Sequence, residues 1–392
     1  MHILHVVGAR PNFMKAAPVL RALSATAGVR QTLVHTGQHY DNAMSDVFFQ
    51  QLEMPQPDCN LGVGSGTHAQ QTAAVMQAFE PVLLERKPDL VLVYGDVNST
   101  VAAALVCSKL NVRVGHVEAG LRSRDRTMPE EINRLVTDQL SDLLFTPSAD
   151  GDENLLREGI DRSKIHLVGN VMIDTLLRLL PRAEEHFPAT VSSPYALVTL
   201  HRPSNVDDVV WLRELLATLA ELSGHLHIVF PVHPRTRQRI ESATVGVATG
   251  TSPVPRSEAS GEGKNSAAIL AQTMPPTLHL LKPLPYLEFL ALQRHAAIVI
   301  TDSGGIQEEA TFLGIPCLTV RENTERPITI THGTNQLVGR DLRKLRSAAE
   351  EILRSKPAAP RQEPDRNRVP LWDGHAAERI ARIIVRGSTQ ER

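Results

Sequence analysis

The feature of this sequence that most limits its fold is an alternation, repeated twice, between short runs of Val, Ile and Leu and longer stretches of helical periodicity. Continuous apolar runs of this length are typical of parallel strands buried on both faces, with the intervening helices covering the sheet. The predicted strands span residues 3–7, 32–35, 90–94 and 112–117 in the first half, and 196–200, 226–231, 278–281, 297–301 and 316–320 in the second. We therefore expect an α/β protein with two doubly wound, Rossmann-like domains.

The point at which the pattern restarts divides the chain. We expect an N-terminal domain over residues 1–172, a C-terminal domain over residues 173–373, and a last helix over residues 374–392 that packs back on the first domain. Residues 246–266, rich in Gly, Ser, Pro, Thr and Glu, predict a long mobile surface loop. Two such domains are expected to face each other across a cleft at the carboxyl ends of their strands, where ligands of open α/β sheets bind.

Composition excludes several classes of protein. Lys and Arg total 41 against 43 Asp and Glu, a net charge of −2, so a general nucleic-acid binder is not expected. No apolar run approaches the ~18 residues of a membrane span, and the first residues lack a basic leader, which favours a cytoplasmic protein. Cys59, Cys107 and Cys317 lie far apart and the 16 histidines form no HExxH pair, so neither a disulfide framework nor a metal site is expected.

The first predicted strand runs into a turn that suits an anion. Gly8 precedes Arg10, Pro11 and Asn12, and the helix that follows carries Lys15. A glycine turn, a helix N-terminus and two cations are then expected to lie together and to suit an anionic group. An ordinary turn between a strand and a helix, with exposed cations, is the alternative. Because the segment is not GxGxxG, a nicotinamide cofactor has little support.

A second anion-binding turn follows the strand at residues 297–301. Ser303 is expected to cap the next helix, leaving the amides of Gly304 and Gly305 to hold a diphosphate. Glu308 or Glu309, one turn further on, is placed to accept hydrogen bonds from a ribose. A well-capped helix without a ligand is the alternative.

Two further segments of the second half supply cations and an aromatic platform. Arg321 and Arg326 follow the next predicted strand and suit phosphate charge. The rigid turn at residues 281–286, together with Phe289, is placed to support a base, and a plain core aromatic explains Phe289 equally well.

Carboxylates gather after the strands of the first half. Asp96 and Glu118 each end a predicted strand, and Glu130 follows a short loop, so three acids are expected at one sheet edge. Such acids repel unless they are paired or partly protonated, an arrangement found where a site needs both an acid and a base. Salt bridges to nearby arginines are the alternative. His201 and His233 each precede or adjoin an arginine at a strand end and suit proton transfer or phosphate contact.

Nine ordered motifs then identify a resemblance over residues 1–385: GARPNFMKAAPV, TGQHYDNAMSDVFF, VYGDVNST, GHVEAGLRS with MPEEINR, TLHRPSN, FPVHPRTR, PLPYLEFL, TDSGGIQEEA and TERP. The chain resembles the non-hydrolysing UDP-N-acetylglucosamine 2-epimerases. The resemblance implies the two-domain GT-B fold, no metal or nicotinamide, a homodimer, a UDP-sugar substrate, and interconversion of UDP-GlcNAc and UDP-ManNAc through a glycal. It assigns catalysis to Asp96, Glu118, Glu130 and His201, and substrate binding to Arg10, Lys15, His233, Pro283, Leu284, Tyr286, Phe289, Ser303, Gly304, Gly305, Glu309 and Arg326.

Two alternatives stay open. A related 2-epimerase acting on a UDP-2,3-diacetamido-glucuronate would place the extra carboxylate of its substrate against Arg122 or Arg124. A sugar-nucleotide sensor without catalysis is the other, although a sensor has no use for three retained carboxylates.

Overall fold

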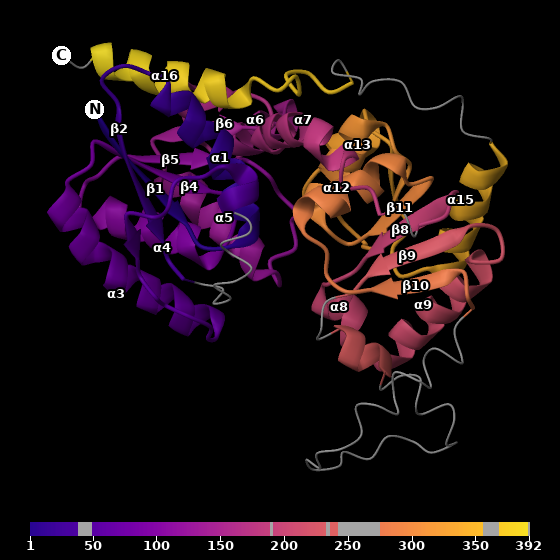
Figure 1. Ribbon diagram of the computed structural model, residues 1–392. Helices are drawn as coiled ribbons and strands as arrows, with labels where there is room; N and C mark the ends of the chain where they lie inside the picture. The colour runs from indigo at the N-terminus through magenta and orange to yellow at the C-terminus, as the bar shows by residue number, and fades with distance from the viewer. Residues whose placement is uncertain (38–48, 189–190, 233–235, 242–274, 356–367, 391–392) are drawn as a thin grey trace. The chain divides into compact units, whose positions relative to one another are not determined.

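A computed structural model describes residues 1–37, 49–188, 191–232, 236–241, 275–355 and 368–390 (Figure 1). The chain forms two compact units. Unit 1 contains residues 1–181, 325–332 and 365–392, and unit 2 contains residues 182–324 and 333–364. The predicted mobile loop at 246–266 lies outside the described residues.

Unit 1 is built on a parallel sheet of seven strands in the order β3-β2-β1-β4-β5-β6-β7. The strands are β1 (His2–Val7), β2 (Arg30–His35), β3 (Cys59–Asn60), β4 (Leu90–Tyr94), β5 (Val114–Val117), β6 (Leu143–Thr146) and β7 (Ile165–Leu167). Every residue of β1 and β4 is buried, as the continuous apolar runs predict for strands covered on both faces. The strand order reverses between β1 and β4, and this switch point is where open α/β sheets bind ligands.

The helices of unit 1 connect and cover these strands (Figure 1). They are α1 (Arg10–Ser24), α3 (His68–Arg86), α4 (Asn98–Lys109), α5 (Pro129–Leu140), α6 (Ala149–Arg157), α7 (Val171–Glu184), α14 (Ile328–Thr331) and α16 (Ala376–Gln390). The last of these, α16, packs against α1. Asp174 of α7 anchors its start, because the carboxylate accepts the backbone N–H groups of Ala376 and Ala377 at 3.2 and 2.7 Å.

Unit 2 repeats the architecture with a parallel sheet ordered β10-β9-β8-β11-β12-β13. Its strands are β8 (Tyr195–Thr199), β9 (His227–Pro231), β10 (Leu278–Leu281), β11 (Ile298–Thr301), β12 (Cys317–Thr319) and β13 (Asn335–Leu337). Its helices include α8 (Pro203–Val206), α9 (Val209–Leu222), α12 (Tyr286–His295), α13 (Gly304–Leu313) and α15 (Leu342–Arg354). The switch point of this sheet lies between β8 and β11.

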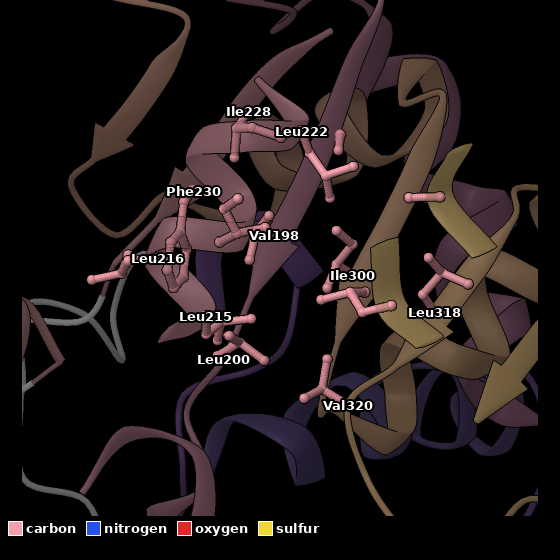
Figure 2. Packing of buried hydrophobic residues seen from close by; sticks show 14 of the residues in the cluster. Val198, Leu200, Leu215, Leu216, Leu222, Ile228, Phe230, Ile300, Leu318 and Val320 are labelled. Atoms are coloured by element: carbon pink, nitrogen blue, oxygen red, sulfur yellow. The ribbon is translucent and has the colours of Figure 1, made fainter. Parts of the chain in front are cut away.

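The core of unit 2 forms where one face of the sheet meets α9 and α15. Val198, Phe230 and Ile300 project from neighbouring strands toward Leu215 and other leucines of α9 (Figure 2). These four residues are all 0% exposed, and unit 1 has a similar buried apolar cluster around β1 and β4.

The fold class predicted from the sequence, two doubly wound Rossmann-like domains of the GT-B type, is confirmed. Four strands were not predicted: β3, β6, β7 and β13. Each has only two to four residues. So few positions give no periodicity, and these strands form because a neighbouring strand already offers its hydrogen-bonding edge.

Candidate active site

The turn after β1 is fixed by a side chain that the sequence analysis left without a role. Asn12, in the first turn of α1, accepts the backbone N–H groups of Gly8 and Ala9 at 3.1 and 3.2 Å and donates to the carbonyl oxygen of Tyr94 at 2.6 Å. It therefore ties the ends of β1 and β4 together at the switch point. Arg10 begins α1 beside this turn, and partial burial lowers the pKa of its guanidinium.

Two cations of unit 1 meet at Glu118. The Lys15 ammonium pairs with Glu118 Oε2, and Arg326 Nη2 lies 2.7 Å from Glu118 Oε1. These side chains are all at least nine-tenths buried, and Arg326 also pairs with the neighbouring Glu325. Buried charges are tolerated when each has a partner of opposite charge. This cluster therefore concentrates paired charges away from solvent.

Asp96 joins the same cluster from the end of β4. Its carboxylate pairs with Arg134 of α5, and its backbone carbonyl accepts the side-chain amide of Asn133 at 2.9 Å. Burial by itself raises the pKa of Asp96, but the positive charges of Arg134, Lys15 and Arg326 together hold it below the usual value of an aspartate. The carboxylate is therefore ionised at neutral pH.

The two adjacent glutamates of α5 differ in environment. Glu131 is 2% exposed and accepts the N–H groups of Ser123 and Arg124 at 2.9 and 2.8 Å, besides pairing with Arg134 at 2.7 Å. It holds the loop before α5. Glu130, the residue assigned to catalysis by the family resemblance, is partly exposed, and within the described part of the chain no hydrogen bond or ion pair engages its carboxylate.

In unit 2, His201 follows β8 and meets Asp302, which follows the adjacent β11. Asp302 Oδ1 lies 3.0 Å from His201 Nδ1, and the same carboxylate accepts the backbone N–H groups of His201 and Arg202 at 3.1 and 3.0 Å and the amide of Asn205 at 3.0 Å. Burial alone raises the pKa of Asp302, but these donors lower it overall. The imidazole is 57% exposed, so Asp302 fixes one ring nitrogen while the other remains available.

Asp302 had a signal in the sequence, because it is the first polar residue after a buried strand at a switch point. Its neighbour Ser303 occupies the N-cap position of α13, but its side chain makes no capping hydrogen bond. The predicted side-chain cap is therefore wrong: the Ser303 N–H instead donates to the Thr301 hydroxyl at 3.0 Å. Gly304 and Gly305 begin α13 and are partly exposed. The Ser303 side chain accepts no hydrogen bond from the N–H groups in the first turn of α13.

Glu309, one turn into α13, is 1% exposed and accepts the Tyr286 hydroxyl at 2.8 Å. Burial raises its pKa to about 7, an effect that the Tyr286 hydrogen bond only partly offsets. Tyr286 and Phe289 lie in the first turn of α12, after a turn in which Pro283 is exposed and Leu284 is partly exposed.

The structure thus brings Lys15, Asp96, Glu118 and Arg326 into one cluster in unit 1, with Glu130 on the helix that carries Arg134. His201 lies beside the residue that precedes Ser303 in unit 2. His233 lies outside the described residues.

Over the described ranges, no three His, Cys, Asp or Glu side chains gather in a way that would hold a metal ion. None of the helices described there combines the length and the apolar character needed to cross a membrane.

Comparison with known proteins gives a consistent result. The model of the UDP-N-acetylglucosamine 2-epimerase family matches residues 21–385. A UDP-N-acetylglucosamine 2-epimerase of Methanocaldococcus jannaschii is 40% identical over 99% of this chain and 100% of that protein. A crystal structure of the M. jannaschii UDP-GlcNAc 2-epimerase in complex with UDP-GlcNAc and UDP has a TM-score of 0.83, covering 98% of this chain and 99% of that one at 39% identity.

A second activity appears among the relatives. A UDP-2,3-diacetamido-2,3-dideoxy-D-glucuronate 2-epimerase of Pseudomonas aeruginosa is 41% identical over 86% of this chain and 88% of that protein. Both relatives are epimerases and therefore isomerases. The chain belongs to the UDP-N-acetylglucosamine 2-epimerase family.

Proposed function

We propose that this protein interconverts UDP-GlcNAc and UDP-ManNAc without net hydrolysis. The observation that carries the proposal is the buried cluster in unit 1, in which the carboxylates of Asp96 and Glu118 alternate with the cations Lys15, Arg134 and Arg326. A site that must both stabilise a departing anion and move a proton needs this combination.

The chemistry explains why both charges are needed. The hydrogen at C2 of the sugar has no adjacent carbonyl, so a carboxylate cannot remove it directly at neutral pH. In the proposed step the bond between C1 and the diphosphate oxygen breaks, its electron pair leaves with UDP, and the C2 proton goes to an enzyme base, which creates a C1=C2 double bond. Return of a proton to the opposite face of C2, with re-addition of UDP at C1, gives the epimer.

Cations and amides are assigned to the departing UDP. Arg10, Lys15 and Arg326 stabilise the growing charge of the diphosphate, together with the helix start at Ser303, Gly304 and Gly305. Interactions of this kind are worth roughly 3–4 kcal/mol for a single preorganised donor. Glu309 is assigned to the ribose, and the turn Pro283, Leu284 and Tyr286, with Phe289, to the uracil; His233 is assigned to the substrate by family likeness.

Proton transfer is assigned to two carboxylates. Asp96 is ionised at neutral pH, which is the form that a base requires. Glu118 contacts Lys15 and Arg326 through both oxygens, so departure of either cation toward the diphosphate would free an oxygen for the sugar. Glu130 and His201 are assigned to orientation or charge stabilisation in the same reaction.

The alternative substrate is a UDP-2,3-diacetamido-glucuronate. A relative that is named for this substrate supports it, but one of the two arginines expected to bind its extra carboxylate is already engaged. Arg122 is 5% exposed, and its guanidinium contacts Asp138 at 2.7 Å and Glu158 at 2.6 Å. A guanidinium engaged in this way is not available to a substrate carboxylate. Two further parts of the proposal are location in the cytoplasm, expected from the sequence, and assembly as a homodimer, expected from family likeness.

The test is incubation with UDP-GlcNAc in deuterium oxide. Deuterium at C2 of both sugars, with formation of UDP-ManNAc, supports the proposal, and exchange only with the diacetamido-glucuronate substrate moves the function to the alternative. Glu118→Gln is expected to lower C2 exchange by at least about 10²-fold, since general acid–base catalysis contributes that much. Glu85→Gln, at a carboxylate 72% exposed, is the control and should leave exchange unchanged.

A further inference from the structure

A second buried charge network adjoins the carboxylate cluster of unit 1. His116 of β5 and Asp138 of α5 are both 0% exposed, and His116 Nδ1 lies 2.6 Å from Asp138 Oδ1. The other ring nitrogen, Nε2, lies 2.8 Å from the carbonyl oxygen of Gly95. The second carboxylate oxygen of Asp138 accepts the backbone N–H of Gly120 at 3.1 Å and contacts Arg122 at 2.7 Å.

These distances determine where the protons lie. A backbone carbonyl oxygen only accepts hydrogen bonds, so His116 Nε2 carries a hydrogen and donates it to Gly95. On the other side, Nδ1 shares a proton with a carboxylate that Arg122 and the Gly120 N–H favour in its charged form. Burial raises the pKa of Asp138, but His116 and Arg122 outweigh it and lower the pKa overall. His116 therefore bridges the Gly95 carbonyl oxygen and the charged carboxylate of Asp138.

The network connects the two turns that carry the proposed proton carriers. Gly95 directly precedes Asp96, and Gly120 follows Glu118 by two residues. The backbone at Gly95, Glu118 and Gly120 has φ angles of +62°, +75° and +82°, a left-handed conformation. The N–H groups of Gly95 and Glu118 still donate to the carbonyl oxygens of Val117 and Phe145 at 3.0 Å. The contacts of His116 and Asp138 add to these bonds at the Gly95 carbonyl and the Gly120 N–H.

We propose that His116 and Asp138 are positioning residues that set the separation of the Asp96 and Glu118 carboxylates, acting through the Gly95 carbonyl and the Gly120 N–H. This inference rests on the proposed function, in which one carboxylate removes a proton from C2 and another returns it to the opposite face. Such a reaction requires two groups held at a fixed separation, and a displacement of about 1 Å costs about 10²-fold in rate.

Asp138→Asn tests the proposal, and Asp142→Asn is the matched control. Asp142 accepts the N–H of Val114 at 2.9 Å. It therefore anchors the amino end of β5, the strand that carries His116, away from the turns at its carboxyl end. Asp138→Asn is expected to lower kcat per folded enzyme by about 10²-fold with KM unchanged to within about twofold, because neither residue of the network touches substrate. Asp142→Asn should change neither. His116→Gln removes the ring that bridges Asp138 and the Gly95 carbonyl, and it serves as a second variant with the same expected result.

Hydrogen–deuterium exchange gives a readout independent of activity. Asp138→Asn is expected to raise amide exchange together in peptides spanning residues 94–97 and 118–121, whereas Asp142→Asn raises it in neither. Equal kcat in Asp138→Asn and Asp142→Asn, or faster exchange at only one of the two turns, would overturn the inference. If the wild-type protein moves no deuterium to C2 of either sugar nucleotide, the proposed function fails, and the exchange measurement still decides whether the network couples the two turns.

Discussion

Gly95→Ala separates the role of the site backbone from that of general stability. Gly95 has φ of +62°, and a Cβ added there would lie 2.5 Å from Lys15 Nζ and 3.2 Å from Glu118 Oε2. The left-handed backbone costs a residue with a Cβ about 1–2 kcal/mol of folding free energy. The ammonium of Lys15 is the end of a flexible chain, so it moves aside, and an ordinary contact of about 3.5 Å requires a shift of about 1 Å.

That shift removes the Lys15 ammonium from Glu118 and from the place proposed for the diphosphate. We expect kcat for epimerisation to fall by about 10²-fold, the usual cost of a 1 Å misplacement. The assay measures C2 deuterium exchange per folded enzyme, together with the free energy of unfolding in urea.

Gly159→Ala is the matched control for the backbone cost. Gly159 has φ of +80°, and a Cβ there would meet nothing within 4 Å. Gly159→Ala is therefore expected to lose about 1–2 kcal/mol of stability, and Gly95→Ala at least as much because it also disturbs the buried Lys15–Glu118 pair, while only Gly95→Ala loses activity. Equal activities in the two variants would refute the reasoning, because the contact with Lys15 would then have no catalytic consequence.

Two further predictions concern unit 2. Burial raises the pKa of Glu309 to about 7, so the native carboxyl keeps its proton at pH values where the unfolded chain has already lost it. The free energy of unfolding of unit 2 therefore falls as pH rises from about 4.5 to 7. Glu309→Gln should remove this penalty, on the order of a few kcal/mol, so that its stability relative to wild type increases between pH 4.5 and 8 in urea titrations; a constant difference would contradict the assigned environment. Phe230→Ala should cost about 3–5 kcal/mol in urea unfolding because its fully buried ring fills the core shown in Figure 2, whereas Val210→Ala, at a residue 65% exposed, should cost under about 0.5 kcal/mol.

The parts of the fold that could be predicted from the sequence are those whose signal is local. A run such as residues 90–94 is apolar at every position because both faces of the strand are covered, and that pattern is visible without knowing its neighbours. β3 and β13 were missed because their two and three residues become strands through pairing with β2 and β12. Pairing between distant segments leaves no periodicity in the shorter partner.

The candidate site shows the same division. Asp96 and Glu118 could be named because each directly follows a predicted strand, and the ends of parallel strands meet at one edge. Nearby arginines could be named as possible partners, but which acid pairs with which arginine could not be predicted. Whether Glu130 or Glu131 faces Arg134 depends on how α5 lies on the sheet, and Asp138 acts on two turns through the tertiary packing of that helix. Orientation of a helix about its own axis is set by contacts that single-sequence patterns resolve only coarsely.

The discontinuity of unit 1 has a consequence for synthesis on the ribosome. Its sheet is complete by residue 167, yet the guanidinium that neutralises Glu118 comes from residue 326 and the helix that packs on α1 begins at residue 376. The nascent first unit therefore waits until residue 326 for the second cation that pairs with Glu118, which only Lys15 matches before then, and until residue 376 for the helix that packs on α1. Every segment of unit 2 emerges earlier than α16. Premature termination after residue 364 would leave every segment of unit 2 present but unit 1 incomplete, in a form that chaperones and proteases recognise.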